Sequence, residues 1–212
     1  IYEQIPDWFW LLAWASMSAF SLFMSLFYSN LIVPLFNKQT PLEEGELRNA
    51  IQVFAEKTNF KLKNIYVING SKRSSKANAY FTGLGVKKRI VLYDTLIQQL
   101  STEEIVAVLA HEIGHNKLQH SLLSLFIYLM LNLLLFFIFG IILKYDVFAQ
   151  AIGCQLASFH VNMLVFSTLY SPISMLLGFW RNVLSRKFEY QADAFVKENG
   201  MEDALISSLK KI

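Results

Sequence analysis

Three long stretches of apolar residues without a charged side chain are the feature that most constrains this sequence. They cover residues 8–33, 121–143 and 157–180. A helix needs about 20 consecutive apolar residues to cross a hydrocarbon core roughly 30 Å thick, and each stretch meets that length. The apolar fraction of the chain, 54%, is high because these stretches contribute so much of it. We therefore predict three transmembrane helices at these positions, with the lipid bilayer around them.

The basic residues are distributed unevenly around the predicted spans. Apart from Lys144, every Lys and Arg lies between Lys38 and Lys117 or between Arg181 and Lys211. Cytoplasmic loops of membrane proteins carry an excess of Lys and Arg. The pattern predicts that both charged regions face the cytoplasm, in a bacterial inner membrane or an endoplasmic reticulum membrane. The formal net charge of +3 is too small to indicate a nucleic-acid partner, so none is expected.

The region between the first two spans, residues 37–120, reads as a soluble cytoplasmic part. Apolar residues recur with helical spacing over residues 42–54, which predicts a surface helix. Three short runs rich in β-branched and aromatic residues follow, at 64–69, 77–82 and 89–93. Such runs, bounded by glycine and polar residues, are typical of strands. They predict a small sheet that is antiparallel in part.

The clearest chemical motif lies on a helix whose start is marked in the sequence. Residues 101–104 (Ser-Thr-Glu-Glu) have the form of a capping box, so a helix begins there and runs on toward the second span. It carries His111 and His115, which are four residues apart and therefore share one helix face. Both imidazoles can reach one metal ion, while Glu112 is placed to act as a general base on water. Gly114 allows another backbone to approach closely.

A zinc site of the catalytic kind needs a third protein ligand and an open position. The metzincin arrangement is excluded, because Leu118 and Ser121 stand where that class has a glycine and a histidine. His160 lies in an apolar stretch, where packing or a hydrogen bond to another helix is the more common role. Glu189 remains, in a cytoplasmic helix predicted within residues 181–212 and on the predicted side of the two histidines. We predict that it is the third ligand.

Asp193 lies one helical turn after Glu189 and on the same face. It is predicted to accept the second ring N–H of a ligating histidine and so to fix its tautomer. Two other interpretations stay open here: a chance His-Glu-x-x-His pattern, and a solvated acidic face beside Arg186 and Lys187. A non-catalytic membrane protein that binds metal is a third. Transport favours ionisable residues inside the spans, and a structural zinc favours a fourth protein ligand, so both are less consistent with this sequence.

The motifs together resemble those of a known family. Residues 111–115 read His-Glu-Ile-Gly-His, and residues 189–193 read Glu-Tyr-Gln-Ala-Asp. Upstream lie Lys-Arg-Ser-Ser at 72–75 and Asn-Ala-Tyr-Phe at 78–81. This combination resembles the type I CAAX prenyl proteases over nearly the whole chain, with the HtpX-type membrane proteases as more distant relatives.

The resemblance implies an integral membrane α-helical protein with a zincin-like α+β metalloprotease domain. It implies one Zn²⁺ per chain, and these roles: ligands His111, His115 and Glu189, catalyst Glu112, and Asp193 as the group that supports a ligand. It also implies that Asn78, Ala79 and Tyr80 bind the substrate. An edge strand beside the zinc can pair with an extended peptide, which gives this assignment a physical basis.

The implied reaction is the hydrolysis of peptide bonds by a zinc-activated water, as in a metalloendopeptidase. Substrates of the eukaryotic family are C-terminally prenylated, CAAX-type proteins, so the expected partners are membrane-associated or prenylated peptides and proteins. Quality control of membrane proteins, as in HtpX-type proteases, is the alternative role. The sequence begins with Ile1, and the family has further spans before the first one here and a C-terminal segment with a His and an Arg near the site. We therefore expect a piece of a longer protein.

Overall fold

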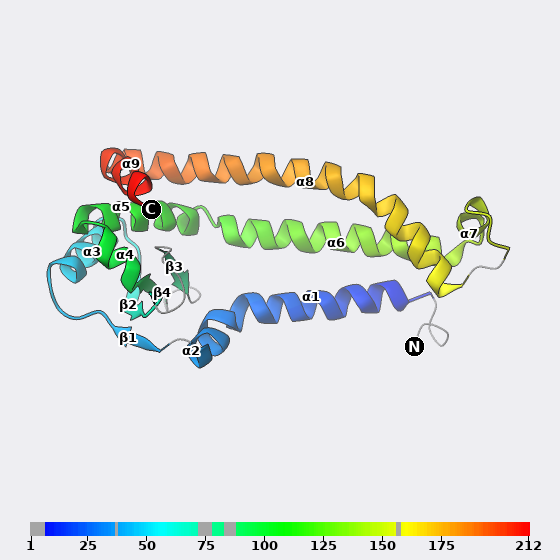
Figure 1. The fold of residues 1–212 in the computed structure, drawn as a ribbon, viewed down its shortest axis with the longest axis horizontal. Helices are drawn as coiled ribbons and strands as arrows, with labels where there is room; N and C mark the ends of the chain where they lie inside the picture. Colours follow the sequence, from blue (N-terminus) through cyan, green and yellow to red (C-terminus); the bar gives the residue numbers. More distant parts are fainter. Residues whose placement is uncertain (1–6, 37, 72–77, 83–87, 156–157) are drawn as a thin grey trace. The chain divides into compact units, whose positions relative to one another are not determined.

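The computed structural model describes residues 7–36, 38–71, 78–82, 88–155 and 158–212 (Figure 1). The chain divides into two compact units, each assembled from segments that are distant in the sequence. We call residues 7–22 and 121–187 the helical unit, and residues 23–120 and 188–212 the sheet unit. The predicted Lys-Arg-Ser-Ser motif at 72–75 lies outside the described residues.

Three helices of the described chain are long and apolar enough to cross a membrane, which confirms the predicted number. They are α1 (Phe9–Phe27), α6 (His120–Lys144) and α8 (Phe159–Glu198), and the short α7 (Val147–Ala151) lies between the last two in sequence. Many of their large apolar side chains are exposed, among them Leu164 and Met175. Such a surface is suited to contact with lipid. Helix α1 continues through a π-helix (Tyr28–Ile32) into α2 (Val33–Phe36).

Helix α8 is one uninterrupted helix of 40 residues, about 60 Å long at 1.5 Å per residue (Figure 1). The sequence predicts a span at 157–180 followed by a separate helix, whereas the structure joins the two. The physical reason is that no glycine or proline occurs between Arg181 and Glu198. The helix ends just before Gly200, which has a left-handed backbone (φ 73°) that favours glycine. Helix α9 (Glu202–Lys211), which the sequence analysis does not predict, follows.

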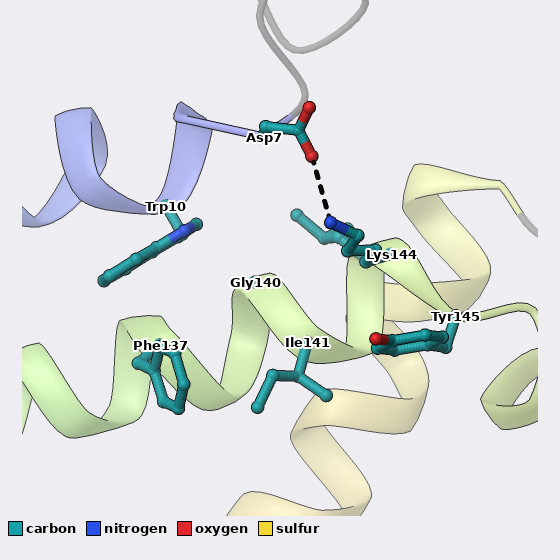
Figure 2. A pocket seen from close by; sticks show the side chains of 8 residues that line it. Asp7, Trp10, Phe137, Gly140, Ile141, Lys144 and Tyr145 are labelled. Atoms are coloured by element: carbon teal, nitrogen blue, oxygen red, sulfur yellow. Dashed lines mark hydrogen bonds and ion pairs between the residues drawn. The ribbon is translucent and has the colours of Figure 1, made fainter.

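In the helical unit, α1 packs on α6 through two tryptophans. Trp14 Nε1 donates a 3.1 Å hydrogen bond to a backbone carbonyl of α6. Trp10 lies against Gly140, where a Cβ atom would come within 2.6 Å of the indole ring. A hollow of about 380 Å³ opens beside Trp10, with the ion pair of Asp7 and Lys144 at 3.5 Å on its wall (Figure 2). None of the predicted site residues lines this hollow, so it is not the candidate reaction centre.

The sheet unit contains a four-stranded sheet with the order β1-β2-β4-β3. The strands are β1 (Gln39–Pro41), β2 (Leu62–Ile68), β3 (Ala79–Thr82) and β4 (Lys88–Tyr93). Strands β2 and β4 are parallel, with Ile65 opposite Ile90, and the two outer strands run antiparallel to their neighbours. The prediction of a partly antiparallel sheet is therefore confirmed. Strand β1 is not predicted from the sequence, because three residues ending in proline give no strand pattern.

A hydrophobic core lies between this sheet and the helices of the unit. The helices are α3 (Glu46–Lys57), α4 (Asp94–Gln99), α5 (Thr102–Lys117), α9 and the end of α8, which contributes Val196. Helix α5 lies in the middle of this core, with Leu109, Ala110 and Ile113 almost fully buried. Its backbone is therefore held from several sides, which suits a helix that must position reactive groups.

The two ends of α5 differ in how they are made. At the start, Ser101 N donates to Glu104 Oε2 over 2.9 Å and Glu104 N donates to Ser101 Oγ over 3.3 Å, so the predicted capping box is confirmed. At the other end, Gln119 adopts a left-handed backbone with φ 55°. The sequence predicts that the helix continues toward the second span, whereas this turn separates α5 from α6. As a result, His120 does not follow the spiral of α5.

Candidate metal centre

The two histidines of the motif lie side by side on α5. The Nε2 atoms of His111 and His115 are 3.1 Å apart, because residues four positions apart are stacked on one helix face. Their side chains are 18% and 20% exposed. The pair is thus partly enclosed and still accessible from one side.

Helix α8 brings a carboxylate to the same point. Glu189 Oε2 lies 3.3 Å from His111 Nε2 and 3.5 Å from His115 Nε2, so the three predicted ligands meet. Ligand atoms about 2.0–2.1 Å from a tetrahedral zinc ion lie roughly 3.3 Å from one another. The observed triangle of 3.1, 3.3 and 3.5 Å therefore fits such an ion. The carboxylate is 54% exposed, which leaves an open side for a further ligand.

Asp193 contacts the other ring nitrogen of His111. Its Oδ1 lies 2.9 Å from His111 Nδ1, so the ring donates its Nδ1–H to the carboxylate and keeps the Nε2 lone pair free. Asp193 therefore makes the predicted contact with a histidine of the motif, and its role in supporting a metal ligand stays a prediction. Asp193 and Glu189 are one turn apart on α8 and contact the same histidine through its two different nitrogens.

Close packing of α5 against α8 is possible because of Gly114. A Cβ atom at this position would lie 3.1 Å from Phe195 Cβ and 3.2 Å from Ala192 Cα, closer than ordinary van der Waals contact. The glycine predicts the close approach of another backbone, and the structure identifies it as that of α8. The glycine thereby sets the distance between the helix with the histidines and the helix with the carboxylates.

The second ring nitrogen of His115 meets residues that the sequence analysis does not predict for the site. His115 Nδ1 lies 2.9 Å from His120 Nδ1, and His120 Nε2 lies 3.0 Å from Gln191 Oε1. On a continuous helix, residues five apart are rotated by about 140° and do not meet. Only the left-handed turn at Gln119 brings His120 back to His115, and residue spacing carries no signal for it. The fourth histidine, His160, is exposed and lies in the helical unit, with its ring 6.1 Å from that of Phe159. The sequence predicts that it is packed or hydrogen-bonded to another helix.

Comparison with known proteins places this arrangement in a family. Residues 41–212 match peptidase family M48, and residues 1–38 match the CAAX prenyl protease N-terminal region, which is described as five membrane helices. The first match covers well over half of the chain. The chain belongs to peptidase family M48. This confirms the resemblance seen in the motifs.

Relatives of this M48 chain include proteins named CAAX prenyl protease 1 homolog. The protein of Oryza sativa subsp. japonica is 44% identical over 204 residues, which are 94% of this chain and 47% of the relative. That of Homo sapiens is 36% identical over 245 residues, 97% of this chain and 52% of the relative. The crystal structure of S. mikatae Ste24p matches with a TM-score of 0.85 and 35% identity over 98% of this chain and 52% of that one. The predicted fold class is confirmed, and the chain spans about half the length of these relatives.

Two groups of the M48 motif have shifted pKa values. Burial lowers the pKa of His115, and the neighbouring His111 lowers it further, so the neutral imidazole that can bind a metal is favoured. Burial raises the pKa of Glu112, while His111 lowers it and Glu189 raises it. A carboxyl with a raised pKa holds a proton more readily, which suits a group that must both take and release one.

Strand β3 carries two of the predicted substrate-binding residues, Ala79 and Tyr80, and packs against α5. The third, Asn78, directly precedes the strand. Strand β3 is the last strand in the order of the described sheet, and the start of its predicted run, Ala77, lies outside the described residues. Asn78 is exposed and its carbonyl accepts a 3.0 Å hydrogen bond from Tyr93 N. Strand alternation then directs the backbone groups of Ala79 away from β4. Burial raises the pKa of the Tyr80 phenol to about 12, so it stays neutral.

Proposed function

We propose that this chain carries the reaction centre of a zinc-dependent membrane endopeptidase that hydrolyses peptide bonds in membrane-associated, C-terminally prenylated substrates. The observation that carries the proposal is the triangle of His111 Nε2, His115 Nε2 and Glu189 Oε2. Its edges have the length that tetrahedral coordination needs, and no fourth protein ligand joins the three among the residues that the structure describes. A closed structural site would have a fourth protein ligand there.

Zinc is the metal that this donor set favours. Two imidazoles and one carboxylate are the ligands of many catalytic zinc sites. When bound, such an ion lowers the pKa of a water molecule to about 7 and polarises a carbonyl group. His111, His115 and Glu189 would hold it, and the Asp193 carboxylate keeps His111 in the tautomer whose Nε2 is free.

Glu112 is the proposed proton carrier. Its carboxylate takes a proton from the attacking water as the water oxygen bonds to the carbonyl carbon of the peptide. The same carboxyl then gives this proton to the amide nitrogen as the C–N bond breaks. The pKa of Glu112, raised by burial, supports both halves of this exchange.

The substrate is proposed to bind in an extended form along β3. Its backbone would pair with the outward N–H and C=O of Ala79, as peptides add to exposed sheet edges elsewhere. The Ala79 side chain is buried, so only its backbone is available for this contact. Asn78 and Tyr80 flank it and are the side chains proposed to touch the substrate. The prenylated class of substrate is carried over from the names of the relatives.

The placement in the membrane is also part of the proposal. The clustering of Lys and Arg supports a multi-pass protein, in the endoplasmic reticulum membrane or a bacterial inner membrane, with the zinc site on the cytoplasmic side. Single cysteines at Glu43 and Tyr145 in a Cys154→Ser background test it with a membrane-impermeant maleimide. We expect labelling of Glu43→Cys from the cytoplasmic side and of Tyr145→Cys from the opposite side. The reverse pattern would refute the orientation.

A chelation experiment tests the proposed activity. The purified protein in lipid vesicles is given a farnesylated CAAX-type peptide and the same peptide without the farnesyl group. We expect cleavage of the farnesylated peptide that is lost with a chelator and restored by Zn²⁺. Equal cleavage of both peptides would favour the quality-control role, and a protein that binds zinc but cleaves neither would favour the non-catalytic interpretation.

A further inference from the structure

We propose that His120 and Gln191 form a positioning pair that holds the ring of His115 in the tautomer and orientation needed for metal binding. This inference rests on the proposed zinc site and adds two residues to it. His120 contacts His115 directly, and Gln191 acts through His120.

The hydrogen bonds allow one consistent assignment of protons. For His115 to offer its Nε2 lone pair beside His111, the neutral ring must carry its proton on Nδ1. That Nδ1–H then donates to His120 Nδ1 over 2.9 Å, so His120 must carry its own proton on Nε2. His120 Nε2–H in turn donates over 3.0 Å to Gln191 Oε1, which as an amide oxygen can only accept. Every ring nitrogen therefore has a role, and the chain of bonds ends in a neutral acceptor.

The position of His120 is fixed by its surroundings. Only 4% of its surface is exposed, and its ring stacks on Phe188 with centroids 4.2 Å apart and planes inclined by 10°. The left-handed turn at Gln119 points the ring at α5. A buried polar ring is costly unless its hydrogen bonds are made, so this burial stabilises the chain of bonds in one form.

Each of the two ligand histidines is thereby supported at its Nδ1 atom. Asp193 holds His111 and the His120–Gln191 pair holds His115, and both supports include a residue of the same five-residue stretch of α8. The support of His111 is a carboxylate and that of His115 is neutral. Glu189 contacts both histidines through their Nε2 atoms. Groups of this kind typically change metal affinity 10- to 100-fold when removed.

The test measures zinc affinity of the purified full chain by competition with a chelator of known affinity. His120→Phe keeps a ring that can stack on Phe188 but removes the acceptor, and we expect affinity to fall about 10- to 100-fold. His120→Asn places an amide oxygen near the former Nδ1 and should recover part of the loss. His160→Phe removes a histidine outside the site and should leave affinity unchanged.

A second measurement separates positioning from general stability. Gln191→Leu should weaken zinc binding less than His120→Phe, and the double variant should be no worse than His120→Phe alone, because Gln191 acts through His120. The thermal midpoint of the metal-free variants should stay near wild type. Additive losses in affinity that track a falling midpoint would overturn the proposal, as would wild-type affinity in His120→Phe.

The proposed function and this inference fail in different ways. If wild type binds zinc and Glu189→Ala does not, the metal site stands, and wild-type affinity in His120→Phe then refutes the positioning pair alone. If wild type binds no zinc, or Glu189→Ala binds it equally well, the metal site itself is wrong and the positioning pair falls with it.

Discussion

Two glutamates of helix α5 occupy opposite electrostatic settings although both are enclosed by the protein. Glu104, in the first turn, accepts hydrogen bonds from Lys211 Nζ at 2.8 Å, from Ser207 Oγ at 2.6 Å and from Ser101 N at 2.9 Å. These donors, led by Lys211, lower its pKa to about 2. Eight residues later, burial raises the pKa of Glu112. One carboxylate is held charged, while the other is prepared to change its protonation state.

Hydrogen-bond donors, more than depth of burial, set the charge of these two enclosed carboxylates. The donors to Glu104 come mainly from α9, so this carboxylate holds the last helix against the first turn of α5. Glu112 instead has the candidate metal ligands His111 and Glu189 among its neighbours. Helix α5 thus has a structural end, at Glu104, and a chemical end, at Glu112. Substitutions at the two ends should therefore affect different properties of the protein.

The largest expected effect is on turnover. Glu112→Gln removes the proton carrier and should lower peptide hydrolysis by about 10²- to 10⁴-fold, the range of general acid–base catalysis, with bound zinc and the thermal midpoint unchanged. Hydrolysis assays with metal analysis check this. Glu103→Gln, an exposed glutamate of the same helix, is the matched control and should keep full activity. Undiminished hydrolysis by Glu112→Gln would remove this residue from its role.

The next effect is on metal affinity through helix spacing. Gly114→Ala puts a methyl group against Ala192 and Phe195, so α8 must move by a few tenths of an ångström, and the Glu189 carboxylate moves with it. We expect zinc affinity to fall about tenfold, in the lower part of the range for groups that orient ligands. Gly178→Ala is the control on α8, since its added Cβ meets no atom within 4 Å. Equal affinities in the two variants would contradict a tight α5–α8 contact.

A smaller effect concerns stability at the structural end. Glu104→Gln removes the charge that pairs with Lys211, and the thermal midpoint should fall by several degrees while zinc affinity stays near wild type. Lys211→Met should produce a similar fall, and the double variant less than the sum. Lys210→Met, an exposed neighbour, serves as the control. A loss of zinc in Glu104→Gln with an unchanged midpoint would mean that the two ends of α5 have been assigned the wrong way round.

The smallest effect is a pH dependence of that stability. The pKa of Glu104 is about 2 in the folded chain against an ordinary value of 4.5, so the folded state favours the charged form. The stabilisation is complete above about pH 4.5 and is lost as the pH falls toward 2. Unfolding midpoints of wild type and Glu104→Gln should therefore converge over this window. A difference that stays constant from pH 6 to pH 3 would show that the carboxylate contributes through packing alone.

Much of the site could be predicted from the sequence because its rules are local. A spacing of four residues puts His111 beside His115, and the same spacing relates Glu189 to Asp193. The four residues of the capping box predict where α5 starts. A zinc site needs a third ligand, and the sequence offers few candidates for it, so we predict that the helix with Glu189 meets the helix with the two histidines. The structure brings these groups together.

The rest depends on backbone geometry that spacing does not encode. His120 meets His115 only because Gln119 takes a left-handed conformation, which a non-glycine residue adopts seldom. Gln191 lies two residues from Glu189 and from Asp193, off the face they share, so helical periodicity assigns it no part in the site. The continuity of α8 is not predicted for another reason. The change from apolar to charged residues at Arg181 marks a change of surroundings and not the end of a helix.

The zinc content of the purified chain shows whether the three proposed ligands hold a metal ion. We predict about one zinc per chain in wild type, none in Glu189→Ala, and one again in Glu198→Ala, which removes an exposed glutamate from the same helix. That result would establish that His111, His115 and Glu189 hold the metal together. Zinc retained by Glu189→Ala, or absent from a folded wild type, would show that these three residues do not form the metal site.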